Sequence, residues 1–236
     1  MPNQHISSAY DRDLDGITTL IMKMGGLVEE AILHATQGLV TRDVELAERV
    51  RAGDKAIDAL EFQINEEAAR TIALRAPVGR DLRVLLTVLR LAASLERIGD
   101  YAKNMAKRTS VLVDMPPIQG AEASLRRMAR EVQGMLRDTL DAYTRSDVAL
   151  AEDVRQHDQD VDQMYNALFR EFLTHMMEDP RNITACMHLH FMAKNIERMG
   201  DLTTNMAEQV IYLSTGTMPD DPRPKSDTTS TLTTLN

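Results

Sequence analysis

ERIGDYAKN, at residues 96–104, returns as ERMGDLTTN at residues 197–205. A second repeat precedes it in each half, where Asp43 is followed by Val-Glu-Leu-Ala and Asp147 by Val-Ala-Leu-Ala. The repeats occur in the same order, and the second copy is about three residues shorter between them. This order indicates an internal duplication in which each half is one structural unit.

The composition favours helices. Of the 236 residues, 43% are hydrophobic but only 4% are aromatic, and Trp is absent. The apolar residues are mostly Leu, Ala, Val, Ile and Met, so residues that prefer strands are few. We therefore expect an all-α protein.

Prolines mark the connections, because proline breaks helix interiors. Proline is absent between Pro2 and Pro77 and then returns mainly in short groups, and Asp43 suits an N-cap. The expected helices cover residues 5–41, 43–75, 81–112, 120–145, 147–178 and 181–214. We predict two tandem three-helix bundles, at residues 1–115 and 116–214, and a disordered tail at 215–236 that is rich in Pro, Asp, Ser and Thr.

Charge and cysteine content exclude several classes of protein. The chain has 27 Lys and Arg against 36 Asp and Glu, a net charge of −9, so nucleic-acid binding is not expected. The lone Cys186 fits a reducing compartment. No leader or spanning segment is evident, which predicts a soluble, cytoplasmic protein that meets a membrane only through partners.

Acidic pairs four residues apart occur on the second and third expected helices of each half. Residues four apart share a helix face, so each pair points two carboxylates the same way. Each pair lies about 20 residues, or roughly 30 Å, from the loop that joins the two helices, so an antiparallel hairpin brings the pairs to one level. The pairs are Asp54/Asp58 and Glu96/Asp100 in the first half, and Asp158/Asp162 and Glu197/Asp201 in the second.

The apolar pattern of the third helix predicts where its acidic pair points. Leu82, Leu86, Leu89 and Ala93 advance in steps of four and three, and the next positions in that rhythm are Glu96 and Asp100. Gly99 and Gly200 adjoin the acidic pairs, where a missing side chain permits close approach. Four convergent carboxylates at the edge of a core require raised pKa values or cations, and hard metal ions meet that need.

Three other interpretations compete with metal binding. Arg97 and Arg198 adjoin the acidic pairs and would neutralise them in a salt-bridge network. A metal-free helical scaffold would act by protein contacts alone. A ferritin-like di-metal enzyme is disfavoured, because it uses Glu-x-x-His and no His here follows a Glu by three positions. No catalytic motif is present, so we do not expect an enzyme.

Several motifs together resemble the PhoU family over about residues 5–215. They include Met24-Gly25-Gly26, Arg75-Ala76-Pro77, both Glu-Arg-x-Gly-Asp copies and Phe191-Met192-Ala193-Lys194-Asn195. The resemblance implies two three-helix bundles with multinuclear clusters of iron or zinc, held by the eight acidic residues named above, with Asn104 and Asn205 as weaker candidates. The chain departs from the family after Asp201, where Leu202-Thr203-Thr204 stands and many relatives have a His.

The resemblance also implies a regulatory role. Members of this family act as negative regulators of the phosphate-starvation response and of phosphate transport. They contact the ATPase subunit of the phosphate ABC transporter and the sensor histidine kinase of the membrane, and they are often homodimers.

Overall fold

The protein is built from six long helices. The computed structural model describes residues 2–220, with side chains from Tyr10 onward. The helices are α1 (Pro2–Thr41), α2 (Val44–Arg75), α3 (Arg80–Leu112), α4 (Ala121–Arg145), α5 (Val148–Glu178) and α6 (Ile183–Thr215), and a short 3-10 turn (η1, Pro180–Asn182) precedes α6. Residues 2–220 contain no strand, so the all-α prediction is confirmed. The helix ends lie within about three residues of those expected from the proline pattern.

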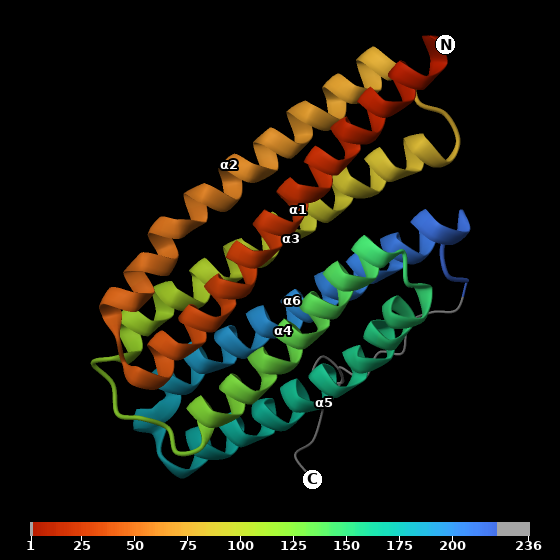
Figure 1. Ribbon diagram of the computed structural model, residues 1–236. Helices are drawn as coiled ribbons and strands as arrows, with labels where there is room; N and C mark the ends of the chain where they lie inside the picture. The colour runs from red at the N-terminus through yellow and green to blue at the C-terminus, as the bar shows by residue number, and fades with distance from the viewer. Residues whose placement is uncertain (1, 221–236) are drawn as a thin grey trace.

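The helices form two three-helix bundles that lie side by side (Figure 1). One bundle consists of α1, α2 and α3, and the other of α4, α5 and α6. The bundles meet where α1 packs on α4 and α3 packs on α6, which leaves α2 and α5 on the outside. The connection between them spans residues 113–120. Of the predicted tail at 215–236, residues 221–236 lie outside the described part of the chain.

The second helix of each bundle, α2 or α5, begins in the same way. The side-chain Oδ1 of Asp43 accepts a hydrogen bond from the Leu46 N–H at 2.8 Å, and that of Asp147 accepts one from the Leu150 N–H at 3.1 Å. Each aspartate thus satisfies an amide that the helix start leaves free. The expected N-cap at Asp43 is confirmed, and the equivalent Asp147 caps α5 in the same way.

A continuous apolar core runs through both bundles. Its members are mainly Leu, Ile, Val, Met and Ala, which fits the low aromatic content. The bundles are in close contact at Gly25 of α1, where a Cβ atom would stand 2.4 Å from Cδ1 of Leu140 on α4. Within the described residues, no helix combines the length and the apolar character that crossing a membrane requires.

Candidate functional site

The acidic pairs of the first bundle meet around one lysine. Lys103 Nζ donates to Asp54 Oδ2 at 2.5 Å and to Asp100 Oδ1 at 2.6 Å. Asp54 is on α2 and Asp100 on α3, so the helix hairpin brings the two pairs to the same level. These two hydrogen bonds raise the pKa of Lys103, which is therefore a fixed positive charge at physiological pH.

The two remaining carboxylates of this cluster, those of Asp58 and Glu96, have raised pKa values. The pKa of Glu96 is raised, first by desolvation and then by the negative charges of Asp100, Glu61, Asp58 and Asp54. The pKa of Asp58 is raised by desolvation and by Asp54, while Lys103 pulls it down. The cluster therefore holds more negative charge than Lys103 neutralises.

Glu96→Gln is expected to stabilise the fold at pH 7 by about 0.5 kcal/mol, the size of one like-charge pair on a helix. The pKa of Glu96 is higher in the folded chain than its ordinary value of 4.5. Ionisation of Glu96 therefore destabilises the fold as the pH rises from 4.5 through the folded-state pKa. Urea unfolding at pH 7 and pH 3.5 measures this difference, which should vanish at the lower pH. Glu66→Gln, at an exposed position on α2, is the control. An equal gain in both variants, or a gain that persists at pH 3.5, would contradict the electrostatic cause.

The predicted stripe of the third helix is wrong in register. Leu86 is 42% exposed and Ala93 is also exposed, whereas Leu85, Ala92 and Leu95 are buried. The buried face of α3 follows Leu85, Val88, Ala92 and Leu95, so the core stripe is displaced around the helix from the expected one. The first acidic cluster therefore lies at the edge of the bundle, and the side chain of Asp100 is 44% exposed.

Three of the four corresponding residues of the second bundle are buried, and Asp201 is half-buried. Asp158, Asp162 and Glu197 are 2%, 3% and 5% exposed. Lys194 Nζ lies 2.9 Å from Glu197 Oε1 and 4.8 Å from the ring centroid of Tyr165. The duplicated acidic residues thus form a partly exposed cluster in the first half, where only Asp54 is buried, and a mostly buried polar layer in the second.

The glycine of each repeated motif lets the hairpin helices come together. A Cβ at Gly99 would lie 3.0 Å from Cδ1 of Ile57, and one at Gly200 would lie 3.4 Å from Cγ1 of Val161. The Oδ1 atom of Asp158 is 3.7 Å from the same position at Gly200. The expected close approach is therefore that of the partner helix, which carries an aspartate with it.

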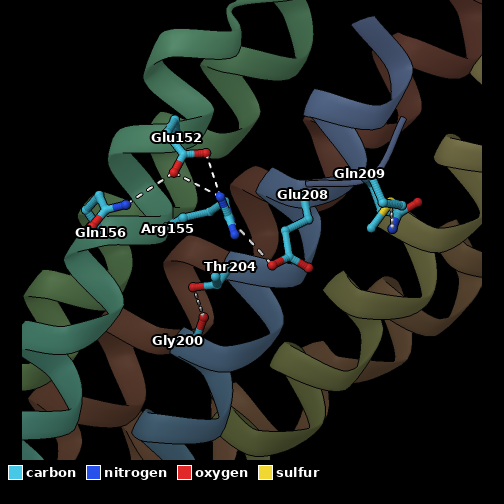
Figure 2. A network of polar contacts seen from close by, with 8 residues as sticks. Glu152, Arg155, Gln156, Gly200, Thr204, Glu208 and Gln209 are labelled. Atoms are coloured by element: carbon cyan, nitrogen blue, oxygen red, sulfur yellow. Dashed lines mark hydrogen bonds and ion pairs between the residues drawn. The ribbon is translucent and has the colours of Figure 1, made fainter. Parts of the chain in front are cut away.

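A buried arginine, which the sequence reasoning missed, joins α5 to α6 (Figure 2). The Arg155 side chain is 5% exposed, and its Nη1 lies 2.7 Å from Glu152 Oε2 while its Nε lies 3.4 Å from Glu208 Oε1. The first half repeats only part of this arrangement, since Arg51 pairs with Glu48 on the surface. One sequence signal could have revealed this arginine: the second half has the acidic Glu208 where the first half has Lys107.

The alternative to metal binding, a salt-bridge network through Arg97 and Arg198, is also wrong. Neither arginine forms an ion pair with another described residue, and Arg198 instead lies over the ring of Tyr101 at 6.0 Å. Lys103 instead contacts Asp54 and Asp100, and Lys194 contacts Glu197. Among the described side chains, no three His, Cys, Asp or Glu residues are arranged to hold one metal ion.

Comparisons with known proteins agree on one family. The PhoU domain model matches the chain twice, at residues 21–109 and 125–210. The phosphate-specific transport system accessory protein PhoU homolog of Rhizobium meliloti is 44% identical over 98% of both chains. The protein of the same name from Xylella fastidiosa is 46% identical, over 98% of this chain and 95% of its own.

Two solved structures share the fold. PhoU from Pseudomonas aeruginosa superposes with a TM-score of 0.85 at 37% identity, over 88% of this chain and all of its own. The phosphate transport system regulatory protein PhoU from Streptococcus pneumoniae gives a TM-score of 0.83 at 29% identity, over 89% of this chain and 99% of its own. Both relatives are named accessory proteins, and the S. pneumoniae structure is named a regulatory protein.

Proposed function

The chain belongs to the PhoU family, and from this premise we propose that it is a non-enzymatic regulatory adaptor of a phosphate transport system. In this role it acts in the cytoplasm and contacts the ATPase subunit of the phosphate ABC transporter and the sensor histidine kinase. These contacts keep the phosphate-starvation response repressed while phosphate is plentiful.

The observation that carries this proposal is the full-length match to relatives named as accessory proteins of phosphate transport. The R. meliloti relative is covered over 98% of its length, so the chain retains both halves of the family's architecture. The long outer helices α2 and α5 and the α3–α6 face offer broad surfaces, as an adaptor with several partners requires.

Deletion of the gene tests the proposal. We expect a phosphatase reporter of the starvation response to rise at least tenfold in phosphate-rich medium and to return to its basal level when the wild-type chain is supplied again. If the reporter stays repressed in the deletion strain, the negative-regulator role is wrong.

We also propose that the two acidic clusters bind hard cations, with a multinuclear iron or zinc cluster as the form the family suggests. The donor chemistry fits, because carboxylate oxygens are ligands for hard divalent ions. The arrangement of the first cluster does not fit without change, since Lys103 already holds Asp54 and Asp100. Lys103 therefore competes with metal in the first half. The second half has the uncharged Thr204 at the corresponding position, although Lys194 contacts Glu197 there.

Lys103→Thr is expected to increase the affinity of the first cluster for Mn²⁺ or Zn²⁺ at least tenfold, because Asp54 and Asp100 lose their resident cation. Titration calorimetry and elemental analysis of the purified full-length protein measure affinity and metal content. Lys107→Thr, one turn further along α3 and exposed, is the matched control.

The same series separates metal binding from a metal-free scaffold. Asp100→Ala in the Lys103→Thr background should abolish the added affinity. Less than about a tenth of a metal atom per chain in wild type and variants, with none gained on reconstitution, would contradict cation binding and leave the adaptor role intact.

A further inference from the structure

A line of arginines follows the boundary between α3 and α6. Arg83, Arg90 and Arg97 recur every seven residues on α3, so they share one side of that helix. Arg108 lies on the same side about three turns beyond Arg97, and Arg198 of α6 faces this line across the boundary. We call these five residues the arginine seam.

The seam arginines make neutral contacts between α3 and α6. The Arg108 guanidinium lies 4.5 Å from the ring centroid of Phe191, and Arg90 Nη1 donates to Gln209 Oε1 at 3.2 Å. Arg198 stacks on Tyr101. Within residues 10–220, no carboxylate forms an ion pair with any of the five seam arginines. Five guanidinium groups without carboxylate partners are unusual on a chain whose net charge is −9.

Exposed apolar side chains accompany the seam. Five of the large exposed hydrophobic residues of the described chain belong to α3 or α6: Leu86, Val111, Ile183, Met187 and Phe191. Phe191 contacts Arg108 directly, which places apolar surface beside positive charge. Arginine, methionine and aromatic residues are the types that protein interfaces enrich.

We propose that the arginine seam docks a partner protein through a surface of clustered carboxylates around apolar side chains. This inference rests on the proposed adaptor function and assigns its contact surface. From Arg83 to Arg108 the seam extends over 25 residues of helix, or about 38 Å. An arginine guanidinium is planar and donates two parallel hydrogen bonds to one carboxylate, which a lysine ammonium cannot do.

The overall charge favours a protein partner over an extended polyanion. A chain of net charge −9 is repelled by an anionic membrane or by nucleic acid, whose charge continues beyond the seam. A small acidic patch on a partner protein can contact the seam without lying close to the other, negatively charged parts of this chain. Charge complementarity therefore selects a protein with a bounded acidic surface.

Site-specific photocrosslinking of the full-length protein in phosphate-rich cells tests this assignment. Ala93 lies exposed on α3 between Arg90 and Arg97, and benzoylphenylalanine at this position should crosslink to a different protein. Mass spectrometry should locate the link in a segment with clustered Asp and Glu. The control position is Ala167, which is exposed on α5. Crosslinks to a second copy of this chain, to lipid or to nucleic acid, or equal products from Ala167, would overturn the proposal, as would no product.

Charge reversal provides the second measurement. Arg90→Glu combined with Arg97→Glu should reduce the Ala93 product at least tenfold and raise the phosphatase reporter toward the deletion level. Arg127→Glu combined with Arg170→Glu, at exposed positions on α4 and α5, should change neither. Arg90→Ala with Arg97→Ala, which adds no new charge, serves if the reversed chain melts below wild type, and it should show the same loss.

The two proposals fail in different ways. If deletion raises the reporter but the Arg90→Glu, Arg97→Glu chain represses it fully, the seam is not the contact surface and the adaptor role stands. If deletion leaves the reporter repressed, the adaptor role is wrong, and the crosslinked product alone decides whether the seam binds an acidic protein.

Discussion

Arg155→Met is expected to lower the free energy of unfolding by about 3 kcal/mol, at the lower end of the cost of breaking a buried ion pair. Methionine keeps much of the side-chain volume but leaves Glu208 and Glu152 without their cation (Figure 2). Both glutamates retain some exposure, which limits the penalty. For a chain of this size the melting temperature should fall by roughly 6–12 °C.

The internal duplication supplies the matched control for this prediction. Arg51 is the counterpart of Arg155 and pairs with Glu48, yet both side chains are about half exposed, so Arg51→Met should cost less than about 0.5 kcal/mol. Urea unfolding followed by circular dichroism measures both variants. Equal losses would show that the α5–α6 ion pairs do not anchor the second bundle. Combining Arg155→Met with Glu208→Met should recover part of the loss, because the unpaired carboxylate is removed.

Gly25→Val should cost about 2 kcal/mol more than Gly26→Val. Valine at Gly25 points into the contact between α1 and α4, where Cδ1 of Leu140 would lie 2.4 Å from the new Cβ. The leucine end is flexible, but a branched side chain requires the two bundles to shift as well, and overpacking of this kind costs about 1–3 kcal/mol.

The neighbouring glycine isolates that packing effect. A Cβ at Gly26 meets no heavy atom within 4 Å, so Gly26→Val carries only the helix-propensity change that Gly25→Val shares. Thermal unfolding compares the two variants directly. If Gly25→Val is no less stable than Gly26→Val, the close contact of the two bundles contributes nothing to stability. Leu140→Ala in the Gly25→Val background should restore part of the loss by making room.

Features that depend on local chemistry could be predicted from the sequence. Proline positions and the aspartate caps determine where helices begin and end, and both act within a few residues. The helix ends and the cap at Asp43 were therefore predictable. The proximity of Asp54 and Asp100 was also predictable from the sequence. Helix rise per residue is constant, so residues equally far from the loop of a helix hairpin lie side by side.

Features that depend on neighbouring helices could not be predicted in the same way. Leu86 and Leu85 are equally apolar, and only the positions of α1, α2 and α6 decide which one is buried. Lys103 reaches Asp54 across the hairpin, a contact that spacing along one helix does not reveal. Arg155 is buried because Glu208 of the adjacent helix receives it, whereas Arg51 has no such partner and stays exposed.

The antiparallel packing of α3 on α6 has a consequence for the origin of the molecule. Early residues of α3 meet late residues of α6, as Arg90 meets Gln209, and late residues of α3 meet early ones, as Arg108 meets His188 (Figure 1). Equivalent helices that pack antiparallel on each other have the arrangement found across the twofold axis of a symmetric homodimer. Gene fusion of such a dimer raises the effective concentration of one half for the other. Fusion also lets the two halves diverge in sequence. Thr204 and Glu208 differ in this way from their first-half counterparts, Lys103 and Lys107.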